Sequence, residues 1–546
     1  MSDEISNDND NEMFVDEIPP DDDKKPITNR KKASGILRGI GYNINYIIGA
    51  GIFNPDGIWL LVGSPGIALI LYILCFLISL LSSSVYIELG IRSLPSGIGE
   101  QKYITDAFFP KKNFGHMFSF VAIFVILPGI IVAESYTAAQ YLLFCFRGNS
   151  SDDMITVAVS ITLLLIIMLY QMISSRVSNY INHTLALIKI ITLLFISVIG
   201  LVKLGTNRNN WNNIFNTSNT SFNFGAYGNG LIKVLFTYEG WNNINYLIGE
   251  FTSRSDNLEY PSTILKYSSL SSVCISFSLY FLTNAAFITV VGIGNNNETT
   301  PIPIRFGREL FDEPGEKLMS ILIAISAFGC ASAMIFTYSR IIKYAASTGF
   351  TPRRISSIFN SYGLNIDTLM TQLLAQFFYC SSLSFIFLIK NKYNISANIT
   401  DFFATTSQYS AMIYHGTSAL CLYILKKRLM NTNPELFSIP KWMIKIYLLI
   451  IFIIIIASFI PPGNDNFNYL IQYCISWSAV LLGGIIWFVR NRKQSENANP
   501  ELIQNEESNS ETDRNEESIG ETDRNEGSND EGYGMRDLTG LLISSI

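Results

Sequence analysis

The chain has 546 residues, of which 49% are hydrophobic and only 15% are charged, and its mean hydropathy is +0.28. This composition is too apolar for an ordinary soluble enzyme and predicts a polytopic protein of the lipid bilayer. The net charge of −6 misleads, because about 24 of the 44 acidic residues lie in the two terminal segments and the region between them is basic. We therefore expect no nucleic-acid partner, and the 7 cysteines lack the paired spacing of a metal site or a disulfide framework.

Twelve apolar segments predict an all-α membrane protein with twelve transmembrane helices, since each is near the roughly 20 residues that a bilayer core requires. They span residues 36–62, 66–92, 116–146, 154–173, 178–202, 228–249, 262–292, 316–344, 366–389, 399–425, 441–460 and 467–490. The membrane domain is predicted over 35–490. Residues 1–34 and 491–546 are expected to be disordered tails, because they are charged and poor in aromatic residues, and the second contains a ten-residue repeat.

Charge and glycosylation signals agree on the topology. An even number of spans puts both termini on one side, and the loops there hold about 25 lysines and arginines against about 9 opposite, so both termini are predicted to be cytoplasmic. The other side carries six N-x-S/T acceptors, as expected for a plasma-membrane glycoprotein. They are Asn149, Asn216, Asn219, Asn297, Asn394 and Asn398. A further match, Asn182, is predicted to be inaccessible at the inner end of the fifth segment.

Helix-breaking residues interrupt the first and sixth apolar segments. The first interruption, at residues 46–55, contains Gly49, Gly51 and Pro55, and the second is the stretch Phe-Thr-Tyr-Glu-Gly-Trp-Asn at 236–242. Glycine and proline disfavour a continuous helix, and a broken turn is tolerated in the bilayer where it lines a cavity. Paired breaks indicate a substrate site of a transporter, in which freed amides bind an anionic group and freed carbonyls bind a cation. A small zwitterion such as an amino acid fits this pattern.

Ionisable residues inside apolar segments are functional candidates by default, because they are costly in a bilayer. Glu239 stands inside the second break, where it could accept a proton or favour a cationic substrate. The ammonium of Lys189, deep in the fifth segment, could occupy the place of a bound sodium ion. Glu134 could carry a proton or only bond to a neighbouring helix. Glu88, near a helix end, and the lone His415 are more simply interpreted as structural residues.

Six short motifs resemble the L-type amino acid transporters of the amino acid, polyamine and organocation superfamily. They are Ile-Gly-Ala-Gly-Ile-Phe at 48–53, Gly-Ser-Pro-Gly at 63–66, Tyr-Ile-Glu-Leu-Gly at 86–90, Pro-Ser-Gly at 95–97, the stretch at 236–242 and Phe-Thr-Tyr-Ser-Arg at 336–340. The resemblance implies a five-plus-five inverted repeat with helices one and six unwound at the midplane, and two further helices. Among fungal members, methionine permeases of this family work without a glycoprotein heavy subunit, so such a partner is not expected, although Cys145 lies near the family's disulfide position.

The resemblance also implies roles for individual residues around the breaks. The amides of Gly49, Ala50 and Gly51 would bind the substrate carboxylate. The carbonyls of Ile47, Phe236 and Glu239, next to Gly240, would receive the substrate ammonium, and the Phe236 ring would form an outer gate. Lys189 matches a helix-five lysine of sodium-independent relatives. Two departures stand out, since Ala50 replaces a common serine and Glu239 replaces a usual glycine.

Together these patterns predict sodium-independent transport of neutral amino acids such as methionine or leucine. Coupling to protons is expected through Glu239, with Lys189 as the fixed cation and Glu134 as the next candidate. An obligate exchanger, a cationic amino acid transporter, a channel and a non-transporting nutrient sensor remain alternatives. An enzyme is not expected, because the sequence has three histidines without a metal-binding pair and no clustered nucleophile and base. No cofactor and no metal are predicted.

Overall fold

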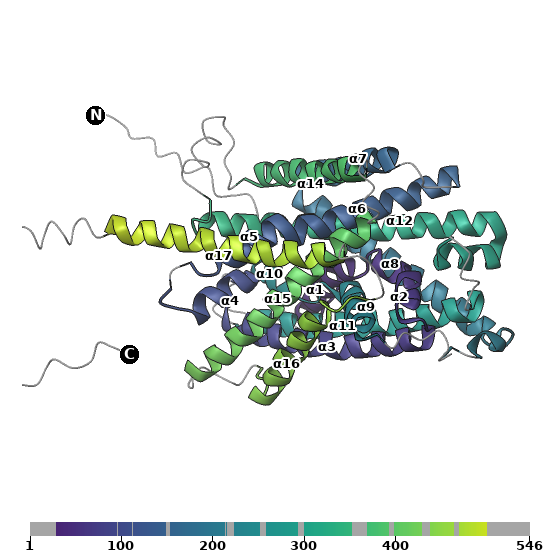
Figure 1. Cartoon of the computed structure of the whole chain (residues 1–546), viewed down its shortest axis with the longest axis horizontal. Coiled ribbons are helices and arrows are strands. Elements are labelled where there is room, and N and C mark those ends of the chain that lie inside the picture. Colours follow the sequence, from purple (N-terminus) through teal and green to yellow (C-terminus); the bar gives the residue numbers. More distant parts are fainter. Residues whose placement is uncertain are drawn as a thin grey trace, which may run out of the picture. The chain divides into compact units, whose positions relative to one another are not determined.

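The computed structural model consists of helices, and no β-strand occurs among the residues that it describes (Figure 1). These are residues 29–94, 97–111, 113–148, 153–212, 214–215, 223–251, 258–292, 300–351, 368–391, 398–428, 437–462 and 469–498. The chain divides into two units, Met1–Trp487 and Phe488–Ile546, and every site residue discussed below lies in the first. The predicted all-α fold is confirmed.

Each predicted apolar segment coincides with one helix or with successive helices. In chain order the helices are α1 (Asn29–Ile47), η1 (Gly51–Phe53), α2 (Pro55–Val62), α3 (Pro65–Arg92), α4 (Gly99–Ala107), α5 (His116–Val121), η2 (Ala122–Ile126), α6 (Leu127–Arg147), α7 (Asp153–Ile173), α8 (Ser175–Lys203), η3 (Arg208–Trp211), α9 (Phe224–Tyr238), α10 (Asn243–Leu247), η4 (Ile248–Glu250), α11 (Glu259–Val291), α12 (Ile302–Ser347), α14 (Leu369–Asn391), α15 (Ile399–Arg428), α16 (Lys441–Ala457) and α17 (Leu470–Ala498).

Eight of the described helical stretches are long and apolar enough to cross a membrane. They are α3, the continuous stretch from α5 to α6, α7, α8, α11, α12, α14 and α17. The remaining segments fall short for physical reasons. α1 is rich in polar residues, the other helices of the first and sixth segments are short, α16 has 17 residues, and α15 carries many buried polar side chains. These criteria do not confirm the count of twelve, which stays a prediction.

Local sequence signals fix the turn between α2 and α3. Gly63 ends α2 with φ of 71°, in the left-handed region that favours glycine. Ser64 then caps α3 by accepting a hydrogen bond from the Ile67 N–H at 3.3 Å, and Pro65 occupies the first turn. The Ser64 hydroxyl also donates to the Ile214 carbonyl at 2.6 Å. This turn therefore holds α2, the second half of the broken first segment, in place.

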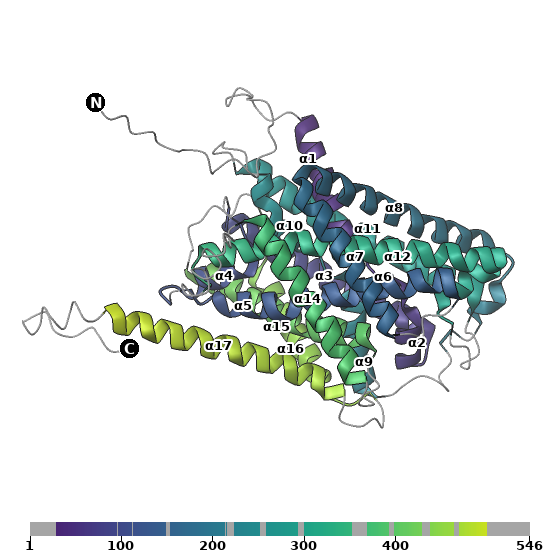
Figure 2. The same cartoon turned by 90° about the horizontal axis from the view of Figure 1, so that it is seen from above.

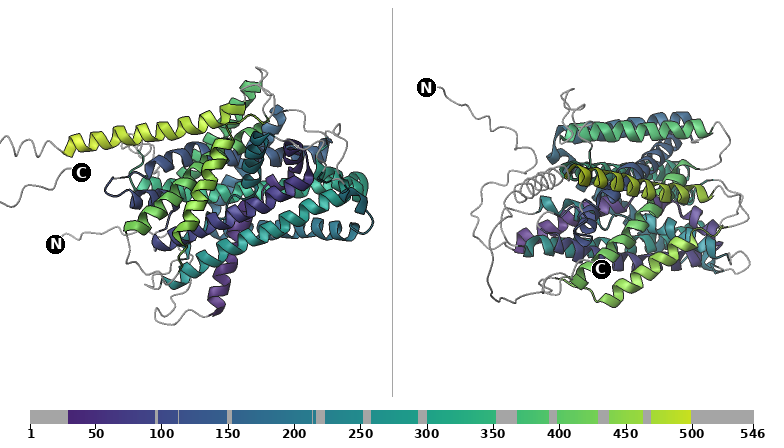
Figure 3. Two further views of the ribbon diagram at one scale, coloured as in Figure 1. Left: turned by 60° about the horizontal axis from the view of Figure 1, so that its bottom comes forward. Right: turned by 60° about the vertical axis from the view of Figure 1, so that its left-hand side comes forward.

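Helix packing puts the two broken segments in the interior. α11 lies against α1, α3 and α8, and α6 packs along α12. Figure 2 shows α8, α11 and α12 side by side. α15 packs on α6 and α9, and α15 and α16 are the neighbouring pale green helices in Figure 3. As a result, every residue from 42 to 50 and from 237 to 248 is buried.

Several predictions concern residues outside the described ranges. Among them are the glycosylation acceptors Asn149, Asn216, Asn219, Asn297 and Asn394 and most of the two tails predicted to be disordered, 1–34 and 491–546. The described parts of these tails, residues 29–34 and 491–498, are helical, so the prediction of disorder is wrong there. Asn398, the remaining acceptor, is exposed directly before α15. Asn182 is buried in α8, as predicted, and the Cys145 thiol is free and buried near the end of α6.

Candidate functional site

Both predicted helix breaks are present. The first segment unwinds between the end of α1 at Ile47 and the start of η1 at Gly51, and it resumes as α2 at Pro55. The sixth unwinds between the end of α9 at Tyr238 and the start of α10 at Asn243. A helix end leaves its last four carbonyls without intrahelical partners. Because these ends are buried, their carbonyls must find partners elsewhere.

Side chains from three other helices satisfy the end of α1. The Asn45 carbonyl accepts a hydrogen bond from Lys189 Nζ at 2.7 Å, and the Tyr46 carbonyl accepts one from Cys330 Sγ at 2.9 Å. The Ile47 carbonyl accepts from the Tyr280 hydroxyl at 3.1 Å. The unwound turn that follows is held in the same way, since the Ser326 hydroxyl lies 3.3 Å and 3.2 Å from the carbonyl oxygens of residues 48 and 49. The carbonyls at the first break are therefore hydrogen-bonded to side chains of neighbouring helices.

The two breaks lie against each other. The Tyr280 hydroxyl lies 3.1 Å from the Ile47 carbonyl and 2.9 Å from the Thr237 carbonyl, so one side chain connects both. A Cβ atom on Gly51 would lie 2.8 Å from the Thr237 methyl carbon. Gly240 has φ of 122°, which favours glycine, and a Cβ there would lie 2.4 Å from the Tyr46 ring. The glycines of the two motifs thus allow the broken segments to touch.

Asparagines fasten the segments beside the breaks. Asn43 Nδ2 donates to the Trp241 carbonyl at 3.2 Å, and Asn43 Oδ1 accepts from the Ile244 N–H at 3.0 Å. Asn243 Nδ2 donates to the Tyr42 carbonyl at 3.2 Å. These reciprocal bonds join α1 directly to the break between α9 and α10. The sequence did not predict these bonds, because it does not indicate which group a buried asparagine will contact.

The amide of Ala50 is occupied by a carboxylate from α6. The Ala50 N–H lies 2.9 Å and 3.2 Å from the two oxygens of Glu134, which is 2% exposed. A Cβ on Gly49 would lie 2.4 Å from the same carboxylate, so only glycine leaves room for it. The amide that the sequence assigns to the substrate carboxylate is therefore hydrogen-bonded to the Glu134 carboxylate in this structure.

Lys189 reaches the first break from α8. Its side chain is 1% exposed, and its bond to the Asn45 carbonyl places a cation at the carboxyl end of α1, where the helix dipole is negative. A Cβ on Gly329 would lie 2.9 Å from Lys189 Cε, so that glycine makes space for the lysine stem. Asn45 itself donates through Nδ2 to Asn182 Oδ1 at 2.6 Å, and Asn182 lies about two turns before Lys189 in α8.

Glu239 lies in the second break and turns toward α15. It is 7% exposed. Its carboxylate accepts a hydrogen bond from Gln408 Nε2 at 3.1 Å and lies 3.1 Å from His415 Nε2. The sequence did not pair His415 with Glu239, since 176 residues separate them. Phe236 is partly buried one turn earlier, and its carbonyl accepts the Glu239 N–H at 3.3 Å. The nine site residues predicted from the sequence thus gather at or beside the two breaks.

Glu88, by contrast, has a structural role. Its carboxylate lies 2.8 Å from Arg92 and 2.8 Å from Lys426, and it also accepts the Ile439 N–H at 2.9 Å. A buried carboxylate that is paired and hydrogen-bonded on all sides holds helices together. It ties the end of α3 to the end of α15, and we assign it no part in binding.

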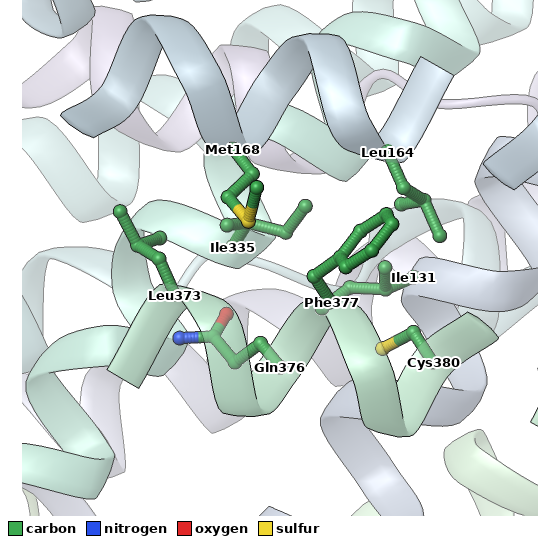
Figure 4. Close-up of a pocket in the computed structure, with 8 residues that line it drawn as sticks. All are labelled: Ile131, Leu164, Met168, Ile335, Leu373, Gln376, Phe377 and Cys380. Atoms are coloured by element: carbon green, nitrogen blue, oxygen red, sulfur yellow. The ribbon is translucent and has the colours of Figure 1, made fainter. Parts of the chain in front are cut away.

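Figure 4 shows a small pocket that lies elsewhere, between α6, α7, α12 and α14. Its lining is Ile131, Leu164, Met168, Ile335, Leu373, Gln376, Phe377 and Cys380. The walls are mainly apolar, and none of these residues belongs to either break. A zwitterion needs convergent donors and acceptors, so the breaks and not this pocket are the candidate substrate site.

Comparisons with known proteins identify the family to which this sequence is similar. A family model described as amino acid permease matches residues 39–486. The b(0,+)-type amino acid transporter 1 of Mus musculus is 26% identical over 465 residues, which cover 84% of this chain and 88% of that protein. The high-affinity methionine permease of Saccharomyces cerevisiae is 24% identical over 489 residues, covering 84% and 79%. The large neutral amino acids transporter small subunit 2 of Homo sapiens is 27% identical over 339 residues, or 60% of each chain.

Solved structures show the same fold. A crystal structure of the Eremococcus coleocola manganese transporter, in complex with an aromatic bis-isothiourea substituted compound, has a TM-score of 0.53 and covers 86% of this chain and 97% of that one. The two sequences are only 12% identical, so this likeness concerns the fold alone.

Proposed function

Because this chain belongs to the amino acid permease family, we propose that it imports neutral amino acids such as methionine or leucine across the plasma membrane, without sodium and together with protons. One observation supports the proposal most strongly. Two helix breaks face each other in the interior, with a carboxylate bound to an amide of the first and a titratable carboxyl group in the second. Such breaks offer amides to the carboxylate of an amino acid and carbonyls to its ammonium.

Sodium independence is supported by the position of Lys189. In a sodium-coupled transporter the carbonyls of unwound helices coordinate the ion, whereas here an ammonium bonds to such a carbonyl at 2.7 Å. We expect that replacing external sodium by choline leaves uptake of radiolabelled methionine into proteoliposomes unchanged. A clear sodium requirement of the parent protein would contradict this assignment.

Substrate binding is proposed to displace Glu134. Two carboxylates near one amide repel each other, so the substrate carboxylate and an ionised Glu134 do not share the Ala50 N–H. Glu134 then either withdraws or takes up a proton, while the amides at Gly49 and Gly51 complete the cradle. The carbonyls of Ile47, Phe236 and Glu239 receive the substrate ammonium, next to Gly240, and the Phe236 ring closes the site as its outer gate.

Proton coupling is assigned to Glu239, and Glu239→Gln tests it. The amide keeps the size and hydrogen bonding of the acid but cannot lose a proton. We expect the variant to exchange internal for external amino acid while losing accumulation driven by a proton gradient, on the order of 10-fold or more. Uptake with and without the gradient measures this.

The exposed Glu259 of α11 provides the matched control, because Glu259→Gln removes a carboxylate that pairs with Lys32 at the surface and belongs to neither break. It should accumulate substrate as the parent does. If Glu239→Gln accumulates substrate with the parent's pH profile, Glu239 is not the coupling group, and Glu134 is the next residue to test.

The same vesicles separate the alternatives. Uptake that requires preloaded amino acid identifies an obligate exchanger, and ligand binding without flux identifies a sensor. Competition by all twenty amino acids decides between a neutral and a cationic substrate. Reconstitution of this chain alone also tests independence from a heavy subunit, which is supported by the burial of Cys145.

A further inference from the structure

A continuous chain of hydrogen bonds leads away from the second break. Glu239 Oε1 lies 3.1 Å from His415 Nε2, and the other ring nitrogen, Nδ1, lies 2.8 Å from the Tyr86 hydroxyl oxygen. Tyr86 in turn donates to Glu100 Oε1 at 2.8 Å. Side chains from the break, α15, α3 and α4 thus connect two carboxyl groups through one imidazole and one phenol.

The whole chain is removed from solvent. The exposed fraction is 7% for Glu239, 2% for His415, 1% for Tyr86 and 2% for Glu100. Burying ionisable groups is costly unless they are hydrogen-bonded, and each of these four groups is hydrogen-bonded to the next. A path for protons needs at each step a group that can both accept and donate, and a carboxyl group, an imidazole and a hydroxyl all meet this requirement.

We propose that His415, Tyr86 and Glu100 form a relay that carries the proton from Glu239 toward the face predicted to be cytoplasmic, an inference that rests on the proton symport proposed above. Protonated Glu239 transfers its proton to His415 Nε2. The proton on His415 Nδ1 moves to the Tyr86 oxygen. Tyr86 passes its own hydroxyl proton to Glu100 Oε1.

This transfer is balanced. Three bonds to hydrogen break, at the Glu239 carboxyl, His415 Nδ1 and the Tyr86 hydroxyl. Three form, at His415 Nε2, the Tyr86 oxygen and Glu100. The net result is a carboxylate at Glu239 and a carboxylic acid at Glu100, while the imidazole changes tautomer and stays neutral. Before the next transfer the imidazole must lose the proton on Nε2 and regain one on Nδ1, because rotation of the ring leaves the proton on the same nitrogen.

Glu100 is the last group of the relay. It lies in the first turn of α4, in the connection between α3 and α5, and the nearby Lys102 and Asp106 of the same helix form a solvent-accessible ion pair at 2.9 Å. The Tyr246 hydroxyl of α10 donates to the second oxygen of Glu100. Burial raises the pKa of the Glu100 carboxyl group, which favours uptake of the relayed proton, while two phenolic donors stabilise the carboxylate that remains when the proton leaves.

The other titratable groups near the chain are phenols. Tyr46 of α1 and Tyr447 of α16 lie near Glu239, and Tyr103 of α4 and Tyr246 of α10 lie near Glu100. Phenols are neutral at physiological pH. Among the described residues, no lysine or arginine forms an ion pair with Glu239 or Glu100, and no three metal-ligating side chains gather at one point. Neither a fixed cation nor a metal site explains the arrangement.

Proton influx into proteoliposomes tests the relay, with the full chain reconstituted and a pH-sensitive dye inside. Tyr86→Phe removes the hydroxyl and keeps the ring. It should lower the proton influx that accompanies uptake by about 10-fold or more, while exchange stays within about 3-fold of the parent. Tyr103→Phe is the matched control, because that ring lies 6.0 Å from the Tyr86 ring and its hydroxyl is outside the relay. It should keep both activities.

The outcomes separate the two proposals. If the parent takes up amino acid without proton influx, proton symport is wrong and the relay with it. If the parent shows influx and Tyr86→Phe keeps it, the relay alone is overturned. If Tyr86→Phe loses exchange as well, Glu100→Gln decides the question. Influx equal to the parent's would then overturn the relay, and lost influx with preserved exchange would support it.

Discussion

Replacing Lys189 by methionine should lower amino acid uptake on the order of 100-fold, because it leaves the buried Asn45 carbonyl without its charged donor. Methionine keeps most of the apolar bulk between α8 and α1, so the change is mainly the loss of the ammonium. That group bonds at 2.7 Å to a carbonyl at the negative end of the α1 dipole. Without it, the first break loses the cation that fixes the end of α1. Initial rates of radiolabelled uptake measure the loss.

Lys203 near the end of α8 offers the control, because it is exposed and lies on the same helix. Lys203→Met should transport as the parent does. Both variants must first elute as monodisperse protein in detergent, so that loss of folding is not taken for loss of transport. Uptake by Lys189→Met within about 3-fold of the parent would mean that the buried donor contributes far less than such a bond usually does.

Gly240→Ala should reduce uptake to a similar degree, since strain of this kind costs about 1–3 kcal/mol and here combines with a steric conflict. The backbone at Gly240 has φ of 122°, which alanine rarely adopts. The added Cβ would also lie 2.4 Å from the Tyr46 ring and 3.2 Å from Ile47 Cγ1. Both neighbours belong to the end of α1, so relief of the clash must move the two breaks apart. Uptake rate and melting temperature should both fall.

Gly249 in η4 is the comparison for this variant. A Cβ there meets no atom within 4 Å, so Gly249→Ala should leave both measurements at the parent's values. A Gly240→Ala protein with normal uptake and normal melting temperature would show that the two breaks need not touch. If Gly240→Ala instead keeps the parent's melting temperature and loses uptake, the substitution impairs the transport cycle and not the stability of the fold.

The sequence by itself determined the helices, the breaks and the identity of the ionisable residues at them. Peptide groups in a bilayer must be satisfied within their own helix or in a protected cavity, so long apolar segments and their interruptions are strongly encoded in local sequence. Gly49, Gly51 and Gly240 therefore marked the unwound turns, and Glu134, Lys189 and Glu239 stood out because ionisable groups are rare at such positions.

Only the tertiary structure decided which groups meet. Glu134 bonds to the Ala50 amide across 84 residues of sequence, and His415 meets Glu239 across 176. Tyr280 bonds to both breaks, although nothing in its own segment distinguishes it from a packing tyrosine. Such pairings depend on how α6, α11 and α15 pack around the broken helices. Local sequence states which side chains are available, whereas the direction and depth of each come from packing among helices distant in the chain.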